Sequence, residues 1–147
     1  EWAYQPIKRK IIIEKLLLDK EGNIPADFKF SVLHGKCVKV RVVFSRSDNM
    51  FSATFDREWN LLIQKGKDAS LLQKIEKPEN YEVMLEIAEK LSTPFDHIRV
   101  DLYNIERKIY VGELTHYPKS GLMADTLASP DADLGKYWKI IPEYWKK

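Results

Sequence analysis

The sequence predicts an α+β domain with a mainly antiparallel sheet, one packed helix and a short helical C-terminal tail. Two stretches of alternating apolar and polar residues, 27–44 and 98–115, each contain a short polar turn and predict two hairpins. Between them, residues 79–91 carry apolar side chains at helical spacing. With 147 residues, the chain is long enough for one such domain with its own core.

The first predicted element is a buried strand at Lys10–Ile13, because three β-branched isoleucines follow one another there. Residues 19–26 include glycine, asparagine and proline and predict a loop. The first hairpin then has strands at 27–33 and 36–44, joined by a turn at His34-Gly35.

The middle of the chain predicts a loop, a connection and the helix. Residues 45–56 are polar and loop-like, and 64–72 form a lysine-bearing connection. Trp59 between them is expected in the core rather than in a site. The helix at 79–91 follows Pro78 and has acidic residues in its first turn, which favour a helix start. Its core face is expected to contain Tyr81, Met84, Leu85, Ala88 and Leu91.

The second hairpin contains the candidate metal- and phosphate-binding residues. Along its first strand Arg99 and Asp101 alternate with apolar residues, and its second strand ends with Glu113 and Thr115. Two carboxylates brought together repel each other unless a cation lies between them. Hard oxygen ligands of this kind suit magnesium, and Arg99 could hold a phosphate oxygen. The alternative is a solvated face with an ordinary surface ion pair.

After this hairpin the chain predicts a loop and a tail. Residues 116–121 contain Pro118 and Gly121, and strands that open into such loops are common places for sites. Residues 123–130 continue as a loop, and a last short helix is expected to begin at 129–133. The aromatic residues that follow are expected to pack rather than to stack on nucleic-acid bases.

These residues resemble a known family. Arg99-Val100-Asp101, then Gly112-Glu113-Leu114-Thr115, then Pro118 and Gly121 look like the metal-binding end of ATP-grasp ligases. The similarity is greatest to the teichuronopeptide-biosynthesis (TupA-like) ATP-grasp proteins, which often carry a glycosyltransferase or polysaccharide-biosynthesis label. The resemblance covers roughly residues 11–121 in the expected order. It implies the C-terminal subdomain of the ATP-grasp fold.

The resemblance implies a nucleotide-binding role for five residues. Either the Glu14 carboxylate or the Lys15 backbone accepts from the adenine amino group, and the backbone N–H of Leu17 donates to a ring nitrogen. Asp27 takes the position that holds the ribose hydroxyls. Lys29 lies on the same strand face and could reach phosphate; the alternative is a solvated strand lysine.

The resemblance also implies the metal site. Asp101 and Glu113 would hold Mg²⁺ bridging the ATP phosphates, and Arg99 would stabilise charge on the transferring phosphoryl group. Thr115 stands where many ATP-grasp enzymes carry asparagine as a further ligand. Because a threonine hydroxyl is a poorer ligand, the resemblance supports a second metal less strongly than the first.

The implied activity is ATP- and magnesium-dependent ligation of a carboxylate to an amine, with an amino acid or a sugar acid as substrate, in cell-surface polysaccharide or teichuronopeptide biosynthesis. No lysine-bearing strand with a Gly-rich loop precedes Lys10, so residues 1–147 are expected to form one domain that is a partial ATP-grasp fold lacking the N-terminal half. Such a chain would be inactive alone and could self-associate. The lone Cys37 fits a reducing cytoplasm and excludes a disulfide framework.

Two other classes of protein remain open. One is a non-catalytic nucleotide-binding or scaffold module, which a large separation between Asp101 and Glu113 would favour. The other is a sugar-transfer enzyme, for which Asp131-Ala132-Asp133 is the only Asp-x-Asp match. A phosphotransferase is a nearer variant of the ligase. The net charge of +2 argues against a nucleic-acid partner, and no apolar run is long enough for a membrane span.

Overall fold

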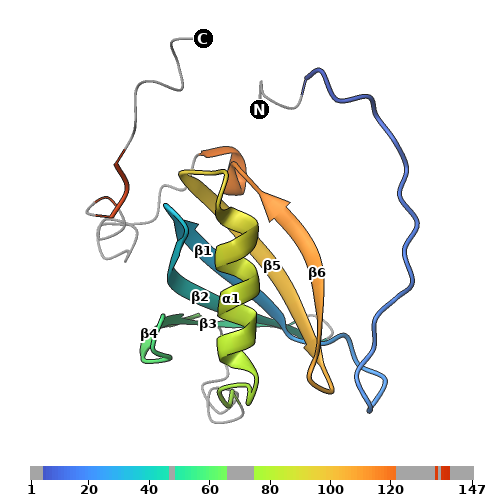
Figure 1. The fold of residues 1–147 in the computed structure, drawn as a ribbon. Coiled ribbons are helices and arrows are strands. Elements are labelled where there is room, and N and C mark those ends of the chain that lie inside the picture. Colours follow the sequence, from blue (N-terminus) through green and yellow to red (C-terminus); the bar gives the residue numbers. More distant parts are fainter. Residues whose placement is uncertain (1–4, 47–48, 66–74, 122–134, 136, 140–147) are drawn as a thin grey trace.

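The protein is built around one antiparallel sheet of six strands. The computed structural model describes residues 5–46, 49–65, 75–121, 135 and 137–139. Within these residues the strands lie in the order β4-β3-β2-β1-β5-β6, so that each hairpin partner is also a neighbour in the sheet (Figure 1). The elements are β1 (Asp27–Leu33), β2 (Lys36–Arg46), β3 (Asn49–Asp56), β4 (Leu61–Lys65), α1 (Tyr81–Ser92), β5 (His97–Ile105), β6 (Lys108–Thr115) and a 3₁₀ turn (Pro118–Gly121).

Both predicted hairpins are confirmed, and each closes with a two-residue turn. His34 and Gly35 have φ angles of 48° and 77°, and Glu106 and Arg107 have 51° and 66°. Positive φ at both central residues matches the right-handed twist of the flanking strands. Neither of the β5–β6 turn residues is glycine, so this turn adopts left-handed backbone at some cost in strain.

The helix lies across one face of the sheet and closes the core. Figure 1 shows α1 in front of the central strands. The expected core face is confirmed for Tyr81, Met84, Leu85 and Ala88, which are buried, while Leu91 is half-buried. Trp59 packs as expected, with its ring stacked 4.4 Å from that of Phe55. The strands contribute the alternate apolar side chains Phe28, Phe30, Val32, Val40, Val42, Phe51, Ala53, Phe55, Ile98, Val100 and Leu102.

The expected loop at 45–56 is wrong. β2 continues to Arg46, β3 occupies 49–56, and β4 occupies 61–65, so that its last two residues lie where the connection at 64–72 is expected to begin. Polar residues dominate the local composition, but Phe51, Ala53 and Phe55 alternate with them and are buried. Period-two burial in the core therefore outweighs the polar character of this stretch.

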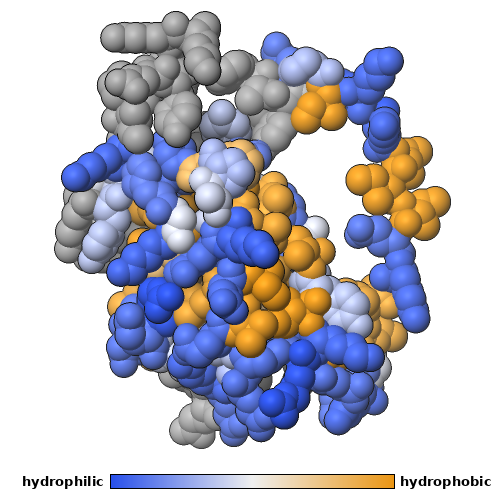
Figure 2. Space-filling model, in the orientation of Figure 1, coloured by the Kyte–Doolittle hydropathy of each residue, from blue (hydrophilic) through white to orange (hydrophobic). Residues whose placement is uncertain are grey.

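The expected buried strand at Lys10–Ile13 is also wrong. Ile11, Ile12 and Ile13 are 93%, 79% and 92% exposed, and residues 8–18 pair with no strand of the described sheet. They belong to an arm, residues 5–24, that runs outside the sheet; in Figure 2 its apolar part stands apart from the body. A β-branched run becomes a strand only where a neighbouring strand satisfies its backbone groups, and the arm has none beside it here.

Candidate functional site

The sheet face away from α1 collects the predicted charged residues. Strand register places Asp101 on β5 between Lys29 on β1 and Glu113 on β6. Two residues before Asp101 on β5, the register pairs Arg99 with Thr115 on β6. Side chains directly opposite on neighbouring antiparallel strands are close enough to interact. The fold therefore brings together residues from three strands and two separate hairpins.

Asp101 is the centre of this cluster. It is only 3% exposed, and both of its oxygens are engaged. The Arg99 guanidinium donates to Oδ1 at 2.7 Å and to Oδ2 at 2.8 Å, and the Lys29 ammonium donates to Oδ2 at 2.6 Å. A buried carboxylate is tolerated when cations and hydrogen bonds compensate it in this way.

Arg99 joins Asp101 to the end of β6. Its Nη2 also lies 3.3 Å from the Glu113 carboxylate and 2.9 Å from the Thr115 hydroxyl. The two carboxylates predicted to share a metal thus share one guanidinium in this structure. Asp101 is buried, whereas the Glu113 side chain is 61% exposed, so one side of the pair is open to solvent.

Asp27 adds a third carboxylate to the face. It forms an ion pair with Lys29, yet its Oδ1 is buried and accepts no hydrogen bond. Burial raises the pKa of Asp27, and the neighbouring Lys29 only partly opposes that change. A buried carboxylate oxygen without a donor costs free energy, so the position of Asp27 destabilises this face unless another contact compensates it.

The two cations of the cluster keep their charge. Burial alone would lower the pKa of Lys29, but hydrogen bonds to Asp101 and Asp27 outweigh burial and raise it. The pKa of Arg99 is raised in the same way, because Asp101 more than offsets burial. The face therefore presents fixed positive charges beside its carboxylates across the neutral pH range.

A bulge in β6 positions Glu113. The β5–β6 register shifts between Asp101 and Leu102, which leaves Gly112 as an extra residue before Glu113. A Cβ on Gly112 would lie 2.9 Å from Tyr103 Cε2 and 3.4 Å from the Asp101 carbonyl oxygen. Glycine is therefore required for the Tyr103 ring to lie over the bulge as it does.

The predicted adenine-binding residues are not brought to this face. Glu14 and Lys15 are exposed on the arm and Leu17 is half-buried. In the part of the chain that the structure describes, none of the three forms a hydrogen bond or ion pair with the charged cluster. Their proposed contact with adenine stays a prediction, because the arm holds them outside the sheet.

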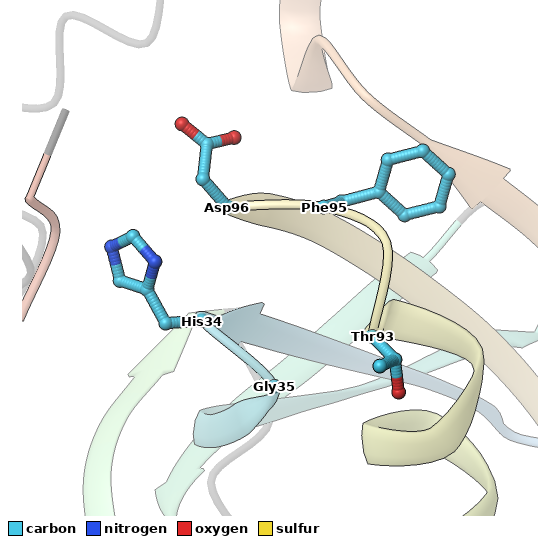
Figure 3. Close-up of a pocket in the computed structure, with 5 residues that line it drawn as sticks. All are labelled: His34, Gly35, Thr93, Phe95 and Asp96. Atoms are coloured by element: carbon cyan, nitrogen blue, oxygen red, sulfur yellow. The ribbon is translucent and has the colours of Figure 1, made fainter. Parts of the chain in front are cut away.

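A separate open pocket of about 260 Å³ lies at the β1–β2 turn. Figure 3 shows its lining by His34, Gly35, Thr93, Phe95 and Asp96. The Asp96 carboxylate is already engaged, since it accepts from the His97 backbone N–H and from the Trp138 indole. None of the predicted site residues lines this pocket, so we place the candidate site on the charged face.

The charged face fits magnesium in its donor chemistry. Asp101, Glu113 and Thr115 offer hard oxygen atoms, which Mg²⁺ prefers, together with phosphate and water oxygens. No group of three or more His, Cys, Asp or Glu side chains within the described ranges is arranged to hold a metal by itself. The remaining ligands would have to come from a nucleotide and from water.

Sequence reasoning missed two residues of this face. Arg41 on β2 lies opposite Lys29 in register, and Tyr103 on β5 lies opposite Asp27. Both follow from the period-two pattern of their strands, which assigns alternate residues to the face away from the helix. The signal was present, but the order of the strands in the sheet was needed to show which residues share that face.

An antiparallel sheet with one helical layer and a charged open face is consistent with the C-terminal subdomain of ATP-grasp proteins. A family model described as TupA-like ATPgrasp matches residues 1–139. The chain therefore belongs to the TupA-like ATP-grasp family, as the resemblance indicated. Searches of curated proteins and of solved structures gave no significant match.

Membership of an ATP-grasp family implies ATP binding and, in general, the use of Mg²⁺. The predicted Asp131-Ala132-Asp133 motif and the expected helix at 129–133 lie outside the described residues. None of the helices in the described part is both long and apolar enough to cross a membrane.

Proposed function

We propose that the charged face binds ATP with Mg²⁺ and belongs to a ligase that joins a carboxylate to an amine. The observation that carries the proposal is the pairing of Asp101 with Glu113 across β5 and β6, with Arg99 contacting both. A large separation of these carboxylates would have favoured a scaffold instead. The magnesium ion supplies charge neutralisation at the phosphates when it is bound.

Each residue of the cluster has a role in this proposal. Asp101 and Glu113 hold the ion, with the Thr115 hydroxyl as a weaker donor. Arg99 and Lys29 turn from these carboxylates toward phosphate oxygens, because an anion competes for the same donors. The Asp27 carboxylate, on a side chain that is 22% exposed, accepts from a ribose hydroxyl.

A second candidate is a non-catalytic module in which the same cluster only stabilises the sheet. One observation favours it: both oxygens of Asp101 are already satisfied by Arg99 and Lys29. In that case the network is complete without a ligand, and ATP would not disturb it. The two candidates therefore differ in whether nucleotide binding changes the contacts of Asp101.

Amide chemical shifts of the ¹⁵N-labelled protein, recorded during titration with Mg–ATP, test the ligand site. We expect changes at Asp27–Lys29, Arg99–Asp101 and Glu113–Thr115, and small changes along α1, which lies on the other face. Titration with a UDP-sugar in place of ATP tests the sugar-transfer alternative. Equal changes on both faces, or changes with the UDP-sugar alone, would contradict the ligase proposal.

The proposal also covers the substrates and the biosynthetic role of the ligase. The substrates are a carboxylate and an amine, such as an amino acid or a sugar acid, used in cytoplasmic steps of cell-surface polysaccharide or teichuronopeptide synthesis. We also propose that this chain alone supplies part of the catalytic fold and self-associates. The support is the exposed apolar arm at Ile11–Ile13 and the open edge of β6, where Val111 is 54% and Leu114 40% exposed.

A further inference from the structure

Arg41 is the cation of the charged face on which this inference rests. Arg41 is half-buried on β2, and its Nη2 donates to the Ser52 hydroxyl at 3.0 Å. Ser52 itself is only 4% exposed, on the neighbouring strand β3. Among the residues that the structure describes, no carboxylate forms an ion pair with Arg41. Within these residues the guanidinium is therefore held in place by a neutral group, and no carboxylate compensates its charge.

The rest of the face differs in its charge balance. Lys29 and Arg99 are both paired with Asp101, and Asp27 and Glu113 add further negative charge on their side. On the β2–β3 side, the Arg41 guanidinium donates a hydrogen bond to the uncharged Ser52 hydroxyl. A guanidinium has five N–H donors in a planar fork, so most of its donors remain available for a planar anion.

A second observation places an unused acceptor nearby. The strand register aligns Ser52, Val43 and Asp27 across β3, β2 and β1. Arg41 reaches toward Ser52 at one end of this row, and the buried Asp27 Oδ1 without a donor lies at the other. Ser52 and Asp27 thus lie on either side of β2 on the same face of the sheet.

We propose that Arg41 and Ser52 form an anion subsite for a carboxylate or phosphate group of the acceptor substrate. Arg41 and Asp101 lie on strands separated by β1, which corresponds to about 10 Å at the usual strand spacing. The acceptor would accordingly carry a second acidic group about 10 Å from its reacting end. This inference rests on the proposed function, because the reacting end is placed at Asp101 and Glu113.

The test uses two small probes on the whole chain. Inorganic phosphate and acetate are titrated separately into the ¹⁵N-labelled protein, and the signals of the Arg41 side chain and the Ser52 amide are followed. Arg41→Gln removes the charge but keeps an N–H donor for Ser52, so the fold is retained. Lys36→Gln is the matched control, since it removes an exposed cation from the same strand.

We expect the wild type and Lys36→Gln to bind a probe at millimolar concentration, with affinity about tenfold lower in Arg41→Gln. Tighter binding of phosphate than of acetate would assign the group as phosphate, and the reverse as carboxylate. Unchanged affinity in Arg41→Gln would overturn the subsite. Absence of any response at Arg41 and Ser52 in the wild type would overturn it as well.

Mg–ATP binding measured on the same variants separates this inference from the proposed function. We expect Arg41→Gln to weaken binding of the anion probe more than binding of Mg–ATP, because in the proposed function Lys29 and Arg99 contact the ATP phosphates. If Mg–ATP fails to bind while the anion probe still does, the proposed function fails and only the anion site remains. If Arg41→Gln weakens Mg–ATP as much as the probe, Arg41 belongs to the nucleotide site and the separate subsite is wrong.

Discussion

At the scale of single residues, Asp101 is the position on which the charged face depends. Its carboxylate is buried and is stabilised by two cations from different strands, Lys29 and Arg99. Neither cation could be replaced by a neutral residue without leaving part of that charge uncompensated. The same arrangement that suits a phosphate and a metal therefore also contributes to stability.

Replacing Lys29 by Met tests this contribution. The variant removes the hydrogen bond at 2.6 Å to Asp101 and the ion pair with Asp27, while Arg99 still contacts Asp101. We expect the free energy of unfolding, measured with urea, to fall by about 1–3 kcal/mol. Lys36→Met, at an exposed position of β2, is the control and should change it by less than about 0.5 kcal/mol. A similar small effect of both variants would show that the network does not stabilise the fold.

His97 predicts a pH dependence of stability. Burial lowers its pKa below the ordinary value of 6.5, and the opposing charge of Asp96 is too weak to restore it. The folded protein therefore favours neutral His97, and this contribution to stability is present above pH 6.5 and is lost as the pH falls through the folded pKa.

We expect the free energy of unfolding to decrease from pH 7.5 to lower pH, and this decrease to be smaller in His97→Gln than in the wild type. The imidazole signals should also give a His97 pKa below 6.5 in NMR titrations. His34→Gln, at an exposed turn position, serves as the control and should keep the pH dependence. A His97 pKa above 6.5 would contradict this account.

At the scale of elements, the β5–β6 hairpin positions two of the proposed metal ligands, Asp101 and Glu113. Its bulge at Gly112 sets the position of Glu113 relative to Asp101. Gly112→Ala would place a methyl group 2.9 Å from the Tyr103 ring, so the ring must move. We expect a loss of about 1 kcal/mol in stability and several-fold weaker Mg–ATP binding.

Calorimetry and urea unfolding of Gly112→Ala check this prediction. Val111→Ala is the matched control, because it changes the exposed neighbour on the same strand and leaves the bulge intact. Mg–ATP affinity that is unchanged in Gly112→Ala would mean that the bulge does not determine the geometry of the site.

Element prediction succeeded where the pattern was local. Both hairpins and α1 follow from alternation and helical spacing, since each is stabilised by residues close in sequence. The prediction for β3 was wrong because polar residues hide the alternation of Phe51, Ala53 and Phe55, which are buried in a core shared with residues distant in sequence. The predicted strand at Lys10–Ile13 is wrong for the opposite reason: the composition favours a strand, but these residues pair with no strand of the described sheet.

In the candidate site, too, the sequence predicts which residues of one hairpin lie together but not which strands meet. Arg99, Asp101, Glu113 and Thr115 lie within one hairpin, so the sequence could place them together. Lys29 meets Asp101 only because β1 pairs with β5, a contact that joins residues 72 positions apart. That pairing depends on the order of strands in the whole sheet, which alternation within single strands does not specify.

At the scale of the whole molecule, the sheet divides the protein into two faces with different tasks. One face packs against α1 and forms the core, and the other carries paired charges beside Arg41, whose guanidinium donates to the neutral Ser52 hydroxyl. The exposed arm lies outside both, with its isoleucines uncovered (Figure 2). Stability therefore comes mainly from one face, while the other is free to bind a ligand.

In our proposal, the charged face binds ATP through a magnesium ion held by Asp101 and Glu113. Calorimetric titration with ATP, in the presence and absence of Mg²⁺, tests it most directly when the wild type is compared with Asp101→Asn/Glu113→Gln. We predict magnesium-dependent binding by the wild type and loss of the magnesium dependence in the double variant. Magnesium-dependent binding of equal strength in both proteins, or no ATP binding by the wild type, would contradict the account.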